Sequence, residues 1–242
     1  MKLALSLALV MFGSSLAYGD EWGYHGAHGP EHWGEISAEF AVCSAGHQQS
    51  PVDLHNAHAG DGHMPELHWT GGDHLQVANN GHTAQVNTPA GSSLVLDGVT
   101  YNLIQFHFHH MSEHTVDGHA YPLEVHFVHA AENGNLAVVG VFFEEGAENA
   151  ELAKIWSAIP GDVGSHDIDG AIDYTAFLPS DHAGYRYQGS LTTPPCSEIV
   201  SWTVMSHALE ASHDQIEAFA HIFHENARPV QDLHGREVFM GH

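Results

Sequence analysis

Short apolar or alternating runs dominate the chain from residue 75 onward, and Gly and Asn separate them. Such runs are typical of strands with at least one buried face. We expect strands at residues 75–78, 83–87, 93–96, 101–109, 123–130, 136–143 and 199–205. Helical spacing is rarer and predicts helices over 147–159 and 212–226. In the second of these helices Ser212 is placed to cap the start, and Ile216, Phe219 and Phe223 repeat along one face.

Residues 21–65 are rich in Gly, His, Pro and Ala and show no sustained period, which predicts a loop-rich segment wrapped over the core. Trp22, Tyr24, Trp33 and Phe40 are aromatic anchors that a solvated tail would hardly carry. No repeat and no linker divides the chain. The pattern therefore predicts a single, mainly β (α+β) domain with short peripheral helices.

The first residues have the features of a signal peptide. Lys2 supplies the positive end, residues 3–12 the apolar run, and small residues near Ala17 or Gly19 the cleavage pattern. A membrane anchor would need about 20 apolar residues, and Gly13 interrupts the run too early. We therefore expect residues 1–19 to be removed and residues 20–242 to form a periplasmic or secreted protein without a membrane segment.

The formal net charge is -25, although only 14% of the residues are charged. Few basic residues remain after the leader, and they are Lys154, Arg186, Arg228 and Arg236. Because so little positive charge is available, we expect neither nucleic acid nor anionic membranes as partners. The 25 histidines could buffer protons, hold extra metal or keep the surface soluble, and the sequence does not choose among these roles.

Cys43 and Cys196 lie far apart in a chain expected to be exported. An oxidising compartment favours a disulfide between them, and two buried free thiols are the alternative. Neither cysteine has the Cys-x-x-Cys spacing of a redox centre or a thiolate metal site.

Three histidines on predicted strands form a candidate metal site. Strand alternation places His107 and His109 on one face of their strand, and His126 lies on a second strand. If the two strands are antiparallel neighbours, the three imidazoles converge. Three histidines with an open fourth position are the arrangement of catalytic zinc, whereas structural zinc sites close that position with a protein ligand.

The same alternation places Gln105 beside His107 and Glu124 beside His126, where each can accept the second N–H of the imidazole. One histidine in so histidine-rich a chain is more often a surface residue, but the paired spacing and the matched acceptors distinguish these three. His110, His114 and His129 lack the pattern and are not expected to be ligands.

Several ordered segments resemble the α-class carbonic anhydrases, and the short path from His109 to Glu113 resembles the bacterial exported members. The segments are residues 49–52, 79–82, 105–109, 112–116, 124–126, 190–195 and 226–229. The resemblance implies a large, twisted, mostly antiparallel central sheet with a conical cleft that reaches one zinc ion. It also implies reversible hydration of carbon dioxide to bicarbonate and a proton through zinc-bound hydroxide, with ester hydrolysis as a side activity.

The resemblance also assigns roles to residues. Thr192 would accept a hydrogen bond from the hydroxide and donate one to Glu113, and His82 would be the proton shuttle. The carbonyl of Asn226 would accept from His109, and Tyr24 and Asn80 would organise the water path. The substrate pocket would be lined by Val128, Val138, Leu191, Thr193, Val200 and Trp202. Cis peptide bonds are expected before Pro51 and Pro195.

Two other interpretations stay open on the sequence. One is a non-catalytic binding or interaction module of the same fold, and the other is a periplasmic metal buffer that uses the many histidines. A buffer predicts several loosely bound ions per chain, whereas the enzyme predicts one tight zinc. The oligomeric state is also open, with a homodimer as one option.

Overall fold

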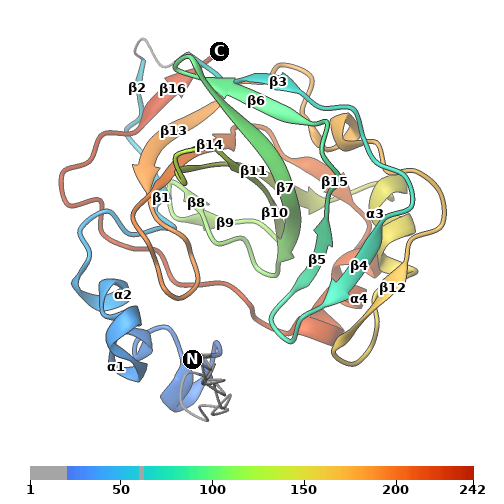
Figure 1. Cartoon of the computed structure of the whole chain (residues 1–242), viewed down its shortest axis with the longest axis horizontal. Coiled ribbons are helices and arrows are strands. Elements are labelled where there is room, and N and C mark those ends of the chain that lie inside the picture. The colour runs from blue at the N-terminus through green and yellow to red at the C-terminus, as the bar shows by residue number, and fades with distance from the viewer. Residues whose placement is uncertain (1–20, 60–62) are drawn as a thin grey trace, which may run out of the picture.

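The structure, a computed structural model, describes residues 21–59 and 63–242, so the expected signal peptide lies outside the described residues. A long, twisted sheet forms the body of the molecule (Figure 1). From one edge to the other its strands are β12 (Gly164–Asp167), β4 (Gln76–Asn79), β5 (Ala84–Asn87), β7 (Val99–His109), β10 (Leu123–Ala130), β11 (Leu136–Glu145), β14 (Val200–Met205), β13 (Gly184–Gly189), β16 (Phe239–Gly241) and β2 (His58–Ala59).

Three further strands pair beside this path, namely β3 (Glu66–His68), β6 (Ser93–Leu96) and β15 (Leu209–Ala211). Most pairs in this large sheet are antiparallel, and its exceptions are β11 with β14, β11 with β15, and β16 with β2. A small second sheet joins β1 (Asp53–Leu54), β8 (Thr115–Val116) and β9 (His119–Ala120). The expected mainly β fold with a mostly antiparallel sheet is confirmed.

All seven expected strands are present, with ends within two residues of the prediction. The sequence pattern missed β12, β13 and β16 and the short strands β1, β2, β3, β8, β9 and β15. Every residue of β12 is exposed, so this edge strand carries no apolar run that could have revealed it. The strand register and the cis peptide bonds before Pro51 and Pro195 agree with the expected fold.

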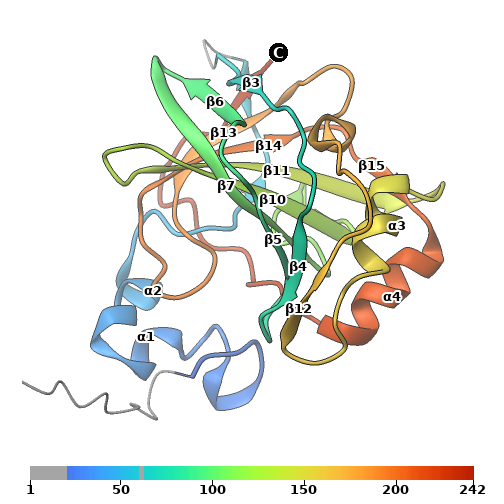
Figure 2. The same ribbon diagram turned by 45° about the vertical axis from the view of Figure 1, so that its right-hand side comes forward.

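The described residues form four short α-helices at the periphery: α1 (Trp33–Ile36), α2 (Val42–Ala45), α3 (Ala150–Trp156) and α4 (His213–Phe223). Single 3-10 turns occur at Gly26–His28, Ala38–Phe40 and Tyr174–Phe177. In both views α1 and α2 lie on one side of the sheet and α3 and α4 on the other (Figures 1 and 2). Ser212 caps α4 through a capping box with Gln215, which confirms the predicted helix start.

The two faces of the sheet carry different side chains. On one face Phe106 and Phe108 of β7 are fully buried in a large apolar cluster that includes Leu152 of α3 and Phe219 of α4. Removing one such phenylalanine side chain would cost roughly 3 to 5 kcal/mol of stability. On the other face, β7 carries His107 and His109, and β10 carries His126. None of the described helices is long and apolar enough to cross a membrane.

His129 is a fully buried histidine at the end of β10. Its Nε2 accepts from the indole N–H of Trp69 at 3.0 Å, and its Nδ1 lies 2.9 Å from the carbonyl oxygen of Phe127. Burial lowers the pKa of His129 to about 4. The unfolded chain takes up this proton near pH 6.5, so the histidine removes stability as the pH falls from about 6.5 to about 4, by roughly 3 kcal/mol in all.

Substituting His129→Gln should therefore flatten the acid side of the stability profile. Urea unfolding of both proteins between pH 7 and pH 4 measures the difference. We expect the variant to lose about 3 kcal/mol less stability than the parent over this range. Parallel stability curves for the two proteins would contradict the assignment of this acid sensitivity to His129.

Candidate metal centre

The register between β7 and β10 brings the three predicted ligands together. His126 lies opposite His107, and Glu124 lies opposite His109. The ring centres are 5.0 Å apart for His107 and His109, 5.3 Å for His107 and His126, and 4.5 Å for His109 and His126. One nitrogen from each ring lies within 4.8 Å of the other two. The three side chains can therefore share one ion.

The outer nitrogen of each ring already has a partner. His107 Nδ1 lies 2.8 Å from Gln105 Oε1, and His109 Nδ1 lies 2.8 Å from the carbonyl oxygen of Asn226. His126 Nε2 lies 2.8 Å from Glu124 Oε1. These acceptors fix the tautomers, because each outer nitrogen must carry the proton. The nitrogens left for a metal are His107 Nε2, His109 Nε2 and His126 Nδ1.

Glu124 holds more of the site than the sequence indicated. Its Oε1 also lies 2.8 Å from His114 Nδ1, and its Oε2 accepts the backbone N–H groups of Glu113 and His114. Burial alone would raise the pKa of Glu124, but His114 and His126 together lower that pKa well below its usual range. A Cβ at Gly140, on the neighbouring strand, would lie 2.9 Å from Glu124 Oε1, so a larger residue there would crowd the carboxylate.

The centre suits a cation bound by neutral ligands. Burial lowers the pKa of His107 well below its usual range and also lowers the pKa of His109, so both rings stay uncharged at neutral pH. His109 Nε2 and Glu113 Oε2 are buried 3.5 Å apart, and neither has a hydrogen-bond partner among the described residues. His126 Nδ1 lies 3.8 Å from the same oxygen. Three imidazole nitrogens with fixed tautomers are a donor set that fits zinc.

Glu113 and Thr192 are both buried. Glu113 Oε1 accepts the backbone N–H of Arg228 at 2.9 Å, whereas Oε2 has no partner in the described part of the chain. The expected hydrogen bond between Thr192 and Glu113 is thus not an observed contact. The loop around Thr192 is closed by two backbone bonds, from Leu191 to Ser197 and from Cys196 to Thr193.

An apolar cluster borders His126. It is formed by strands that lie side by side, since Val128 of β10 pairs with Val138 of β11 and Val138 pairs with Trp202 of β14. The Trp202 ring lies 4.8 Å from that of His126, edge to face. The cluster includes all five predicted apolar pocket residues, Val128, Val138, Leu191, Val200 and Trp202, of which Leu191 is only partly buried.

A cleft of about 120 Å³ opens over His107 and His109. Its lining comes from distant parts of the chain and consists of Trp22, Tyr24, Asn80, His82, Thr83, Gln85, Gln105, His107, His109 and Thr193. The cleft thus brings together Tyr24, Asn80 and His82, which were predicted to form the proton path. It also contains Thr193, the one predicted pocket residue that is not apolar.

His82 stands at the cleft in the turn between β4 and β5. Asn80 Oδ1 accepts the backbone N–H of His82, and Asn226 Nδ2 donates to the His82 carbonyl oxygen. The imidazole stacks on the Trp22 ring with centres 3.8 Å apart and an interplanar angle of 8°. Burial lowers the pKa of His82, and the carboxylate of Glu21 raises it in part. Burial and the charge of Glu113 raise the pKa of Tyr24 well above its usual value.

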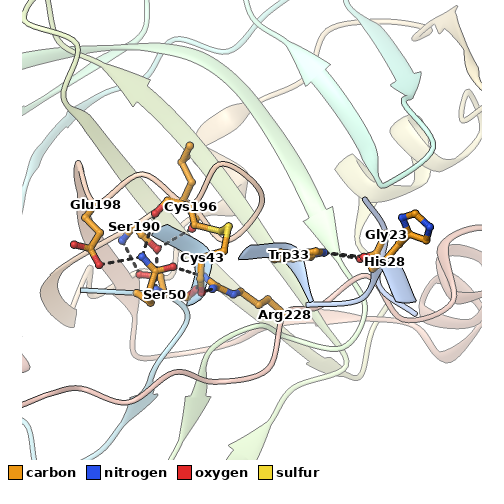
Figure 3. The surroundings of a disulfide bond; sticks show 11 residues. Gly23, His28, Trp33, Cys43, Ser50, Ser190, Cys196, Glu198 and Arg228 are labelled. Atoms are coloured by element: carbon orange, nitrogen blue, oxygen red, sulfur yellow. Dashed lines mark hydrogen bonds between the residues drawn. A yellow bond between two sulfur atoms is a disulfide. The ribbon is translucent and has the colours of Figure 1, made fainter. Parts of the chain in front are cut away.

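Cys43 and Cys196 form a disulfide, as predicted, across 153 residues of sequence (Figure 3). Arg228 is buried beside it and donates to the carbonyl oxygens of Cys43 and Ser50 and to Gln49 Oε1. The Arg228 backbone N–H is the donor to Glu113 noted above. The disulfide region is therefore joined through one residue to the carboxylate at the metal centre.

Comparison with known proteins agrees with this arrangement. A family profile described as eukaryotic-type carbonic anhydrase matches residues 28–242. The chain belongs to the α-class, or eukaryotic-type, carbonic anhydrases. A carbonic anhydrase of a Nostoc species is 47% identical over 90% of this chain and 84% of its own, and one of Pectobacterium atrosepticum is 43% identical over 98% and 99%. The α-carbonic anhydrase of Thermovibrio ammonificans, solved with the inhibitor sulfanilamide, superimposes with a TM-score of 0.88 at 44% identity, covering 91% of this chain and 99% of its own.

This carbonic anhydrase also contains contacts that the sequence did not reveal. His114 was expected only not to be a ligand, yet its Nδ1 shares Glu124 with His126 and its Nε2 lies 2.6 Å from the hydroxyl of Tyr187. Trp22 was expected only as an anchor, yet it stacks on His82. Its proximity to His82 depends on how the N-terminal segment folds back, and no spacing in the sequence encodes that path.

Proposed function

We propose that this carbonic anhydrase hydrates carbon dioxide reversibly to bicarbonate and a proton at one zinc ion, held by His107 Nε2, His109 Nε2 and His126 Nδ1. The convergence of three imidazoles with fixed tautomers carries the proposal. In a three-histidine site zinc lowers the pKa of coordinated water to about 7, an effect for which carbonic anhydrase is itself the standard example. Zinc held by these three nitrogens would supply a nucleophile near neutral pH.

Thr192 and Glu113 are proposed to orient that nucleophile. A hydroxyl group can accept one hydrogen bond and donate another, whereas an ionised carboxylate only accepts. The buried Glu113 Oε2 has no partner among the described residues and is the acceptor that a donating Thr192 requires. When the Thr192 O–H donates its hydrogen bond to Glu113, the Thr192 oxygen can only accept from the attacking oxygen, and this turns a lone pair of that oxygen toward the carbon of the substrate.

Substituting Thr192→Val should lower kcat/KM for carbon dioxide hydration by about a hundredfold, because a misoriented nucleophile loses its near-attack geometry. The zinc content should stay at one ion per chain, since Thr192 supplies no ligand. Stopped-flow hydration assays and metal analysis of the same sample measure both quantities. Loss of zinc together with activity would instead indicate that Thr192 supports the metal site.

The apolar cluster beside His126 is proposed to hold carbon dioxide. The substrate has no charge and no hydrogen-bond donor, so an apolar wall can accommodate it without desolvating a polar group. Val128, Val138, Leu191, Val200 and Trp202 supply that wall, and Thr193 lies in the cleft next to it. Ester hydrolysis is a proposed side activity, because the same nucleophile can attack an activated carbonyl.

His82 is proposed to carry the released proton to solvent. Its imidazole lines the cleft together with Tyr24 and Asn80, and it is neither fully buried nor fully exposed. A histidine in such a position can take a proton on one side and release it on the other with little bias near neutral pH. Tyr24 and Asn80 are proposed to order the water between the metal centre and His82.

We propose that this enzyme is exported to the periplasm or the cell exterior. The Cys43–Cys196 disulfide favours an oxidising compartment such as the periplasm or the cell exterior. Residues 1–19 are proposed to be the cleaved signal peptide.

The decisive test measures zinc content and carbon dioxide hydration on the same purified mature protein. One tightly held zinc per chain with fast hydration supports the enzyme mechanism. Several loosely held ions with slow hydration would favour the metal buffer. One zinc without hydration would favour a binding or interaction module.

A further inference from the structure

The indole of Trp33 closes a turn beside the cleft. Trp33 lies at the start of α1 and is fully buried. Its Nε1 donates to the carbonyl oxygens of Gly23 at 2.8 Å and His28 at 3.0 Å (Figure 3). The Gly23 N–H donates to the same His28 oxygen, at 2.9 Å. One indole N–H thus holds both ends of the 23–28 turn.

Trp33 also packs against the two aromatic residues that flank Gly23. The Trp33 ring meets those of Trp22 and Tyr24 edge to face, with centres 5.4 Å and 5.8 Å apart. Trp22 in turn stacks on His82 at 3.8 Å. A continuous path of contacts therefore runs from the buried indole to the imidazole at the cleft.

The far side of Trp33 is fixed by the disulfide region. The guanidinium of Arg228 lies 5.4 Å from the centre of the Trp33 ring and donates to the carbonyl oxygen of Cys43. Trp33, Cys43 and Cys196 form one buried cluster. One side of the Trp33 indole is thus held by Arg228 and the disulfide, and Trp22 packs against the other side.

We infer that Trp33 is a positioning residue for proton transfer: through its N–H bonds to Gly23 and His28 it holds Trp22 against His82 and so keeps the imidazole in its place at the cleft. The inference rests on the proposed role of His82 as the shuttle. Trp33 does not touch the cleft that lies over His107 and His109. Its loss should therefore slow proton release without changing the conversion of carbon dioxide itself.

The test is Trp33→Phe in the zinc-loaded mature enzyme, which removes the N–H and keeps an aromatic ring. We expect kcat in weak buffer to fall about three- to tenfold, because it includes proton release, while kcat/KM stays within about twofold. Imidazole added as a proton acceptor should restore kcat. Trp156→Phe is the matched control: its indole donates to the Gln215 carbonyl oxygen at 2.8 Å on the other face of the sheet, and both constants should be unchanged.

Equal losses in kcat and kcat/KM, or an unchanged kcat in weak buffer, would overturn the inference. His82→Ala separates it from the shuttle proposal. If His82→Ala lowers the weak-buffer kcat and Trp33→Phe does not, only the role of Trp33 is wrong. If His82→Ala has no effect, the shuttle itself is wrong and the inference falls with it.

A second variant, Trp22→Ala, keeps the test decisive if Trp33→Phe does not fold. Because Trp33 is inferred to act through Trp22, this variant must show the same weak-buffer loss and the same rescue by imidazole. If Trp33→Phe does fold, the double variant Trp22→Ala with Trp33→Phe should lose no more weak-buffer kcat than Trp22→Ala alone. Full activity of Trp22→Ala in weak buffer would overturn the inference.

Discussion

Substituting His107→Ala should reduce carbon dioxide hydration by roughly a thousandfold or more, because zinc is what lowers the pKa of water from 15.7 to about 7 in such a site. His107 supplies one of only three predicted ligands, and its outer nitrogen is already bound to Gln105. His109, on the same face of β7, is itself a proposed ligand and cannot replace it. Metal analysis should show the bound zinc falling well below one ion per chain.

The matched control is His166→Ala, which removes an exposed histidine from the edge strand β12. Zinc content and hydration rate should both equal those of the parent. If His107→Ala kept full zinc and full activity, the proposed ligand set would be wrong. If the control lost a comparable amount of zinc, the metal would be held by the surface histidines, as in a buffer.

The convergence of the three histidines was predictable because its geometry is local to two strands. Alternation along β7 sets His107 and His109 on one face, and the same rule sets Glu124 beside His126 on β10. The only non-local step was the pairing of the two strands. The expected apolar residues Val128, Val138 and Trp202 came together for the same reason, as neighbours in register across three strands.

The contacts of His114, Trp22 and Trp33 could not be predicted from the sequence, because they depend on how irregular segments fold back. His114 follows the turn after β7 and reaches Glu124 only because residues 110–114 fold back toward β10. Trp22 and Trp33 belong to a segment with no period, and their contacts with His82 and Arg228 cross more than fifty residues of sequence. Turn residues and aromatic side chains indicate that such a segment packs, but they do not indicate where it packs.

The disulfide should contribute mainly to stability. Its formation across 153 residues removes much of the freedom of the unfolded chain, so the double variant Cys43→Ser with Cys196→Ser should be less stable by about 3 to 5 kcal/mol. For a domain of this size the melting temperature should fall by roughly 10 °C. Thermal unfolding of the zinc-loaded parent, oxidised and reduced, provides the reference, and the reduced parent should match the double variant.

Catalysis at 20 °C should change little in this double variant. The loop that carries Thr192 is also closed by backbone bonds from Leu191 to Ser197 and from Cys196 to Thr193, and Ser50 Oγ accepts the Ser190 N–H. We therefore expect kcat/KM to stay within about threefold of the parent while the protein remains folded. A large loss of kcat/KM with an unchanged melting temperature would mean that the cross-link positions Thr192 directly and that its contribution to stability is small.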